Sequence, residues 1–219
     1  LRRLQREHPR VGLAALHGVS RRLLVDRWLI FRVPESDQSM DLNGDGDLED
    51  EVLHVYDFEA RTTTNLGLAV AANPFLHDGR RVIFKVSEPD QHQDLNGDGD
   101  TMDFVVDVHD LETGTTTNLG LAVEEPYAWV ESSGKWVAME VPEASQNRDL
   151  NGDGDTRDRT LHVHDLETGS TTNLELASGS PMLSSRWLVF SAIEPYQGQD
   201  LNGDVDQLER RAADNVPAA

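Results

Sequence analysis

The 219-residue sequence predicts an all-β protein built from about four repeats of four antiparallel strands each. The heptapeptide D-L-N-G-D-G-D begins at Asp41, Asp94 and Asp149, and it returns as D-L-N-G-D-V-D at Asp200, with spacings of 53, 55 and 51 residues. The segments between these acidic stretches are short apolar runs or alternate with period two, as strands do. Four strands in about 50 residues is the size of one β-propeller blade. We therefore predict a single repeat domain of propeller blades over residues 1–219, the last blade incomplete.

The repeat divides the chain into units at residues 12–66, 67–119, 120–174 and 175–219, the last of them partial. Residues 1–11 precede the first unit, and R-V-G-L-A-A at 10–15 echoes N-L-G-L-A-V at 65–70, so we expect the N-terminal segment to supply the last strand of a preceding blade. Three arrangements stay open: a four-bladed ring closed within one chain, head-to-tail self-association through open blade edges, or further blades beyond these residues. Because the chain begins with Leu1 rather than Met, we expect a processed product or a fragment.

The first strand of each unit is a short apolar run, too brief for a helix and predicted to be buried on both faces. These runs are Trp28–Val33, Val82–Val86, Trp136–Met139 and Trp187–Phe190.

The second strand follows the acidic segment and alternates roughly between apolar and polar residues, which predicts a half-buried strand. These strands are Val52–Tyr56, Val105–His109 and Thr160–His164. We expect their polar-face histidines, at 54, 109, 162 and 164, to be solvated or paired across strands rather than to bind metal or act as bases.

The segment D-L-E-T-G, at 110–114 and 165–169, predicts a hairpin turn, because Asp initiates turns and Gly accepts positive φ. The hydroxyl-rich runs Thr115–Leu119 and Ser170–Leu174 then form the third strand. A fourth strand around Tyr127–Val130, followed by a turn at Ser132–Gly134, connects consecutive units.

Two stretches carry a resemblance to TolB-type β-propellers. They are H-D-L-E-T-G-T-T-T-N-L at 109–119, with a near-copy at 164–174, and D-G-R-R-V-I-F at 78–84. The resemblance covers most of each unit. It implies the propeller fold and often a binding role, and it implies no reaction.

Each acidic segment places oxygen-bearing side chains at loop positions 1, 3, 5, 7 and 10, with Gly at position 6 to allow a sharp turn. Alternating oxygens of this kind can curl around one ion. The predicted metal ligands are Asp41, Asn43, Asp45, Asp47 and Asp50; Asp94, Asn96, Asp98, Asp100 and Asp103; Asp149, Asn151, Asp153, Asp155 and Asp158; and Asp200, Asn202, Asp204, Asp206 and Glu209.

In their first seven positions these loops resemble the calcium loops of EF-hands, dockerins and integrin-type propeller blades. Position 12, where an EF-hand has a bidentate Glu, is Val52, Val105 or Thr160, and a strand follows instead of a helix. We expect the Asp at position 10 to replace the missing ligand. Carboxylates about 4 to 6 Å apart repel by roughly a few kcal/mol per pair, which a divalent cation reverses. Oxygen-only ligands favour Ca²⁺ or Mg²⁺ over zinc or copper, and a flexible set of five or more oxygens favours Ca²⁺.

The fourth loop, Asp200 to Glu209, has Val205 where the other loops have the position-6 glycine. A β-branched residue at positive φ is strongly disfavoured. We therefore predict that the fourth site is weaker than the others or does not fill.

A glutamate and a glutamine recur six and three residues before each loop, in the motif E-x-x-Q. They are Glu35, Glu88, Glu143 and Glu194, with Gln38, Gln91, Gln146 and Gln197. Both are candidates to support the loop by binding its amides or a metal-bound water, and the alternative is that they are polar strand-end residues.

Composition excludes several classes of function. The formal charge of −21 disfavours nucleic acid and anionic membranes as partners. The lack of cysteine removes disulfides and thiolate chemistry, and no apolar run reaches the length of a membrane span. No nucleophile elbow or phosphate-binding glycine loop occurs, so we expect no enzymatic activity.

These features predict a calcium-binding β-propeller at the cell surface or outside the cell, acting as a structural, adhesive or assembly module, for example in a filament. Extracellular calcium near the millimolar range fills even weak sites. The alternatives are an accessory propeller domain of a larger secreted enzyme and a ligand-binding propeller.

Overall fold

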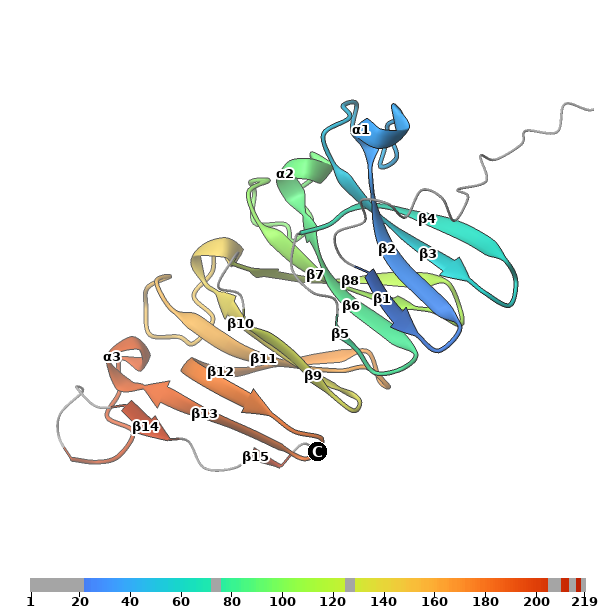
Figure 1. Ribbon diagram of the computed structural model, residues 1–219. Coiled ribbons are helices and arrows are strands. Elements are labelled where there is room, and N and C mark those ends of the chain that lie inside the picture. The colour runs from blue at the N-terminus through green and yellow to red at the C-terminus, as the bar shows by residue number, and fades with distance from the viewer. Residues whose placement is uncertain (1–21, 72–75, 125–128, 205–209, 213–215, 218–219) are drawn as a thin grey trace, which may run out of the picture. The chain divides into compact units, whose positions relative to one another are not determined.

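The computed structural model describes residues 22–71, 76–124, 129–204, 210–212 and 216–217 (Figure 1). The chain forms two compact units, residues 1–70 and 71–219. Among the described residues, no helix combines the length and the apolar character needed to cross a membrane.

The first unit contains one antiparallel sheet of four strands in the order β1-β2-β3-β4. A four-residue helix, α1, follows β2 directly and leads into the first acidic loop. The elements are β1 (Arg22–Val25), β2 (Trp28–Pro34), α1 (Glu35–Gln38), β3 (Glu51–Asp57) and β4 (Thr62–Ala69).

The second unit contains a four-stranded antiparallel sheet in the order β5-β6-β7-β8 and a larger sheet in the order β14-β13-β12-β11-β10-β9, in which β15 also pairs with β13. Its elements are β5 (Leu76–His77), β6 (Arg81–Ser87), α2 (Glu88–Gln91), β7 (Phe104–Asp110), β8 (Thr115–Val123), β9 (Val130–Ser133), β10 (Trp136–Pro142), η2 (Ala144–Gln146), β11 (Arg159–Asp165), β12 (Ser170–Leu183), β13 (Trp187–Ile193), α3 (Glu194–Gln197), β14 (Arg210–Ala212) and β15 (Val216–Pro217).

The third and fourth repeats are joined because β12 is one long strand. Its first part pairs with β11 and its second part, from Ser178, pairs with β13. The predicted all-β fold of four-stranded antiparallel repeats is confirmed, while the residue boundaries of the units stay a prediction.

The strand register is the same in successive repeats. In the first three repeats, the residue that begins the first strand lies opposite the aspartate that ends the next strand. These residues are Trp28 of β2, Arg81 of β6 and Trp136 of β10. The pairing between the second and third strands shifts by a bulge in each repeat. In the first three repeats this common register places the acidic loop at one end of the sheet and a hairpin turn at the other, which is D-F-E-A-R in the first repeat and D-L-E-T-G in the second and third.

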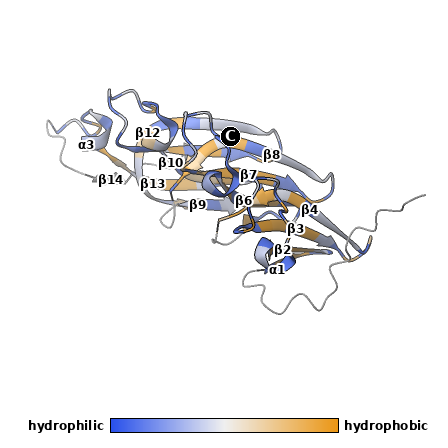
Figure 2. Cartoon of the chain, turned by 90° about the horizontal axis from the view of Figure 1, so that it is seen from above, coloured by the Kyte–Doolittle hydropathy of each residue, from blue (hydrophilic) through white to orange (hydrophobic). Residues whose placement is uncertain are grey.

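The first strand of the first three repeats is buried on both faces, as predicted, whereas β13 of the fourth repeat alternates between buried residues and exposed or half-buried ones, with Trp187 40% exposed. In β10, Val137, Met139 and Val141 pack against the second repeat, whereas Ala138 packs against Leu188 of the fourth. Figure 2 shows the hydrophobic residues concentrated along these strands and hydrophilic residues in the loops. Apolar side chains between the sheets therefore hold the repeats of the second unit together.

The prediction of a half-buried second strand is wrong, because β7 and β11 are buried on both faces as well. His109 and His164 are each only 4% exposed. Their Nδ1 atoms bond the hydroxyl oxygens of Thr116 and Thr171 on the neighbouring strand, at 2.9 and 2.8 Å. Burial lowers the pKa of both histidines, so they are cross-strand polar pairs in a core and are not solvated.

Candidate metal centre

The acidic loop of the second repeat is folded by its own side chains. Both carboxylate oxygens of Asp94 accept backbone N–H bonds, from Gly97 at 2.6 Å and from Gly99 at 3.1 Å. Gly99 has φ +105°, and the corresponding glycines 46 and 154 have +108° and +101°. Side chains rarely adopt this conformation, which explains the glycine at position 6.

The alternating side chains after Asp94 continue the curl. The side-chain oxygen of Asn96 accepts from the N–H of Asp98 at 3.1 Å, Asp98 accepts from Asp100 at 3.1 Å, and Asp100 accepts from Met102 at 2.8 Å. Each bond spans two residues, as in an Asx turn. The same series recurs in the first and third loops. The sequence therefore dictates this shape locally.

The glutamate of E-x-x-Q lies at the centre of each loop. Glu88 is fully buried; its Oε1 accepts from the N–H groups of Leu95 at 2.6 Å and Asn96 at 3.3 Å, and its Oε2 accepts from Asp103 at 3.0 Å. Glu143 repeats all three bonds in the third loop. The short helix begins at or directly after this glutamate, so it fixes the carboxylate against the loop backbone. The predicted role in binding loop amides is thus observed.

In every repeat a buried glutamate converges with loop aspartates that range from buried to exposed, and the ligand atoms of each cluster lie within 4.8 Å of one another. Such clusters can bind a metal ion. The groups are Glu35, Asp45, Asp47 and Asp50; Glu88, Asp100 and Asp103; Glu143, Asp153, Asp155 and Asp158; and Glu194, Asp200 and Asp204.

The structure therefore brings together the side chains at positions 7 and 10 in the first three loops, and it adds a glutamate that we did not count among the ligands. The position-1 aspartates of these loops use both oxygens to bind backbone N–H groups. The position-3 asparagine of each of these loops donates to the position-10 carboxylate, at 2.9 Å in the first loop, 3.3 Å in the second and 3.4 Å in the third. Val205, Asp206 and Glu209 of the fourth loop lie outside the described residues.

The clusters of the second and third repeats are electrostatically uncompensated. Burial, followed by the neighbouring carboxylates, raises the pKa of Asp103 to about 6, and the same causes raise the pKa of Asp158. No arginine or lysine of the described chain forms an ion pair with either cluster. In the first and fourth repeats, the Oε2 atoms of Glu35 and Glu194 are buried without a hydrogen-bond partner. Buried oxygens of this kind fit a bound cation.

Sequence reasoning missed the asparagine of T-T-T-N. Asn118 on β8 donates to the carbonyl of Leu95 at 3.0 Å and so ties the loop to the third strand. Asn65 and Asn173 do the same, at 2.8 and 2.7 Å. The available signal was that this asparagine recurs 23 residues after the leucine of D-L-N in three repeats.

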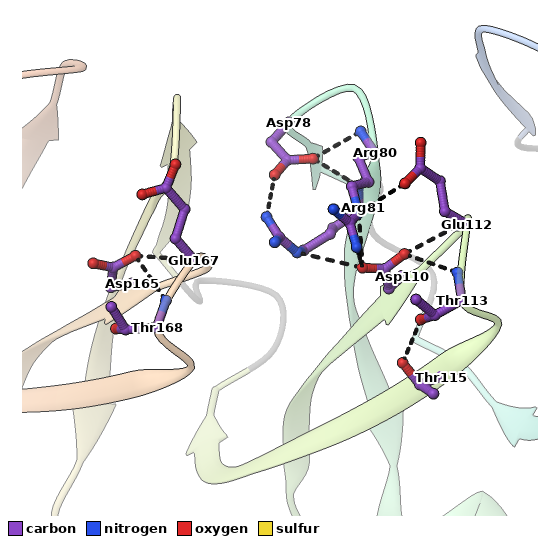
Figure 3. A network of polar contacts seen from close by, with 10 residues as sticks. All are labelled: Asp78, Arg80, Arg81, Asp110, Glu112, Thr113, Thr115, Asp165, Glu167 and Thr168. Atoms are coloured by element: carbon purple, nitrogen blue, oxygen red, sulfur yellow. Dashed lines mark hydrogen bonds and ion pairs between the residues drawn. The ribbon is translucent and has the colours of Figure 1, made fainter.

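The opposite end of the second repeat holds a different polar network (Figure 3). Asp110 accepts from the N–H groups of Glu112 and Thr113 at 3.0 and 3.1 Å, and it forms an ion pair with Arg80 at 2.7 Å. Arg81 pairs with Asp78 at 2.9 Å. A cavity of about 270 Å³ lies beside it, lined also by His164 and Glu167 of the third repeat.

These observations define an all-β repeat protein with buried acidic clusters able to hold metal ions. No protein-family model matches the chain, and no curated protein sequence matches it.

Three solved structures are similar to the chain at low identity. The tricorn protease is 14% identical, with a TM-score of 0.44, over 85% of this chain and 16% of that one. The β-propeller domain of the Trilobed protease from Pyrococcus furiosus is 10% identical, with a TM-score of 0.47, over 89% and 56%. TolB from Acinetobacter baumannii is 11% identical, with a TM-score of 0.33, over 78% and 39%. The chain thus spans less than two thirds of each of these proteins, and its four-stranded antiparallel sheets match β-propeller domains.

Proposed function

We propose that this chain is a calcium-binding β-propeller module in which each intact acidic loop holds one Ca²⁺ ion. The observation that carries the proposal is the buried glutamate within 4.8 Å of the loop carboxylates, at clusters around Asp103 and Asp158 with which no described arginine or lysine forms an ion pair. An external cation removes the repulsion among these groups. The glutamate joins the loop aspartates as a ligand candidate, in place of the distal glutamate of an EF-hand.

The donor set favours calcium among the metals available to proteins. Within each loop and its glutamate, the candidate ligands are carboxylate or amide oxygens, which disfavours zinc and copper because those metals prefer thiolate and imidazole ligands. Ca²⁺ accepts six to eight oxygens in flexible geometry, whereas Mg²⁺ demands a near-ideal octahedron. Loops shaped by several Asx turns offer many oxygens in an irregular arrangement, which suits the larger ion.

We propose a structural, adhesive or assembly role at the cell surface or outside the cell. Each ion bound only by the folded state adds stability by mass action, about 2.7 kcal/mol when free calcium is a hundredfold above the dissociation constant. Calcium at extracellular levels keeps even modest sites filled. The chain would therefore be rigid outside the cell and weakened where calcium is scarce.

The rival proposal is an accessory or ligand-binding propeller of a larger secreted enzyme. The cavity beside Arg81 and His164 is the feature that favours it. Hydrolysis of a panel of peptide and ester substrates by the isolated chain, abolished by His164→Ala, would support that alternative over a purely structural role.

Calorimetric titration of metal-free protein tests the calcium proposal. We expect at least three calcium ions per chain and a melting temperature raised by about 5 to 10 °C per occupied site, given about 2 to 4 °C per kcal/mol for a chain of this length. Glu88→Gln should remove one site, whereas Glu112→Gln, an exposed glutamate at the hairpin end, should remove none. Unchanged melting in millimolar calcium would refute the proposal.

A further inference from the structure

In the second unit, the glutamine of E-x-x-Q binds the preceding repeat instead of its own loop. Gln197, which is 4% exposed, accepts from the N–H of Ala177 at 2.9 Å and donates to the carbonyl of Glu175 at 3.1 Å, at the bulge of β12. Gln146 makes the equivalent pair of bonds with the bulge of β8, once its amide is oriented to satisfy both groups. The predicted loop-supporting role of this glutamine is not what the structure shows.

The turn that contains this glutamine also bonds with the acidic loop of the preceding repeat. We call residues 143–147 and 194–198 the E-x-x-Q turns of the third and fourth repeats. Asn96, at position 3 of the second loop, donates from Nδ2 to the carbonyl of Ser145 at 2.6 Å. Asn151, at position 3 of the third loop, donates to the carbonyl of Tyr196 at 2.8 Å. Both acceptors directly precede the glutamine, so the two loops use the same atom of the turn that follows.

This bond fixes the orientation of the asparagine carboxamide. A carbonyl can only accept, so it selects the Nδ2 end, while the Oδ1 of Asn96 accepts from the N–H of Asp98 within the loop at 3.1 Å. Asn151 is held in the same way. In the fourth loop, the Nδ2 of Asn202 donates instead to the carboxylate of its own Asp204 at 3.0 Å. The following turn thus decides which groups this side chain occupies.

Two further side chains of the third repeat reach the second loop. Asn147, which caps η2 with φ +48°, donates from Nδ2 to the carbonyl of Asp98 at 3.3 Å. Burial raises the pKa of Asp103, and a hydrogen bond with the Ser145 side chain lowers it, so this serine favours the charged carboxylate. Positions 3, 5 and 10 of the second loop are therefore all in contact with the third repeat.

The joint between the third and fourth repeats has a similar geometry. Gly198 replaces Asn147 as the cap residue, with φ +62°. A Cβ added to Gly198 would lie 3.4 Å from the Cβ of Asp153, which is position 5 of the third loop. The second and third acidic loops therefore both form part of an interface with the repeat that follows.

A bound ion and the following turn act on the same loop atoms. The Asx turns shape each loop from its own residues, but the groups at positions 3 and 10 of the second loop are also held from outside it. An ion that orders these groups leaves less to be ordered when the turn docks, and the docked turn does the same for the ion. Such coupling between two binding events is reciprocal.

We propose that calcium in the second and third loops holds each loop against the repeat that follows, so that the E-x-x-Q turn of one repeat sets the calcium affinity of the loop before it. This inference rests on the proposed function, since it needs the loops to bind calcium. Ser145 and Asn147 are then positioning residues for the ion of the second loop, although both belong to the third repeat. Removal of calcium weakens the joints between repeats.

A calcium titration of the whole metal-free chain, resolved by NMR at two glycine amides, tests the proposal. Gly99 reports on the second loop and Gly154 on the third. Asn147→Gly keeps a residue suited to positive φ but removes the carboxamide, and it should raise the dissociation constant at Gly99 about fivefold or more. Gly154 should be unchanged, although Asn147 lies two residues before the third loop, where a purely local effect would appear. Ser39→Gly makes the matching change at the cap of α1 and should alter neither amide.

A second variant keeps the test informative if Asn147→Gly folds poorly. Ser145→Ala removes the hydroxyl beside Asp103, retains the carbonyl that binds Asn96, and should weaken calcium binding at Gly99 in the same direction. If neither Gly99 nor Gly154 responds to calcium in the parent chain, the proposed function itself fails. If both respond, but these two variants leave Gly99 unchanged or weaken Gly154 as much, calcium binding stands and the coupling between repeats is overturned.

Discussion

The two ends of each sheet in the second unit use the same residue, aspartate, in opposite electrostatic settings. At the hairpin end, burial disfavours the charge of Asp110, but hydrogen bonds from Arg80 and from two backbone N–H groups outweigh it and lower its pKa. At the loop end, burial and neighbouring carboxylates together raise the pKa of Asp103 to about 6. Seven residues of chain separate the two groups.

The third repeat shows the same contrast. Lys135 lies 2.9 Å from Asp165 at the hairpin and lowers the pKa of that carboxyl despite its burial, whereas Asp158 at the loop has a raised pKa. Each hairpin therefore contains its own counter-charge, supplied by the residue at or before the start of the first strand. Among the described residues, the acidic loops of the second and third repeats form no ion pair with an arginine or lysine, so these loops are the places where an external cation is needed.

The largest predicted effect is at the loop end, where one substitution should change the free energy of unfolding in opposite directions with and without calcium. Asp158→Asn should destabilise the protein by about 2 to 3 kcal/mol in calcium, since it removes a ligand and with it the mass-action stabilisation. In metal-free buffer the same substitution should stabilise the protein, because it relieves repulsion among buried carboxylates. Urea unfolding in both buffers measures the two values.

If Asp158→Asn destabilises the protein equally in both buffers, the proposed electrostatic difference between the loop end and the hairpin end is wrong. That outcome would mean that hydrogen bonding, such as the bond from Asn151, gives this carboxylate its importance, and that no ion is involved. Asp103→Asn in the second repeat provides an independent replicate.

The hairpin end should behave in the opposite manner. Asp165→Asn weakens the Lys135 pair and the turn contacts to Glu167 and Thr168, so we expect a loss of about 1 to 2 kcal/mol that is the same with and without calcium. Glu167→Gln, an exposed neighbour, should change stability by less than about 0.5 kcal/mol. A calcium-dependent effect of Asp165→Asn would contradict the assignment of the ions to the loops.

The strands and loops could be predicted from sequence because their determinants are local and repeated. A short apolar run such as Trp28–Val33 specifies a doubly buried strand, and the alternating aspartates with glycine at position 6 specify the curl of the loop. Four copies of the motif made these patterns visible in a single chain.

The contacts between repeats could not be predicted in the same way. Nothing local distinguishes Gln146, which binds a neighbouring repeat, from a polar strand-end residue. His164 alternates with apolar residues and so suggests a solvated face, yet it is buried and lines the same cavity as Arg81 of the second repeat. These features depend on what packs against a strand, which the strand's own sequence does not record.

A smaller effect, on calcium affinity, is expected when the fourth loop is given the glycine that the other loops have. Val205→Gly should restore the left-handed conformation that Gly99 and Gly154 adopt, and it should raise calcium affinity there about tenfold, or about 1.4 kcal/mol. Calorimetry should show one more site, or a tighter one. If affinity is unchanged, the missing glycine is not what limits this loop, and the distal residues Asp206 and Glu209 are the next to substitute.

The smallest effect concerns pH in metal-free buffer. Asp103 titrates at about 6 in the folded chain against an ordinary value of 3.8, so the folded state binds more protons between these values and stability falls as pH rises from about 4 to about 6. Asp110 and Asp165 have lowered pKa values, and the stability they contribute is present above about 3.8 and is lost below it.

The metal-free protein should therefore be most stable near pH 4 to 5, below the usual range, with a melting temperature about 2 to 4 °C higher than at pH 7. Saturating calcium should abolish or reverse the fall of stability with rising pH. The ion stabilises the ionised carboxylates, and at low pH protons compete with it for these groups. Asp103→Asn should make the metal-free decline shallower without removing it, because burial also raises the pKa of Asp107 and of Asp158 to about 7, whereas Asp110→Asn should leave the decline above pH 5 in place. A metal-free optimum at pH 7 would mean that the loop carboxylates repel one another less than their burial implies.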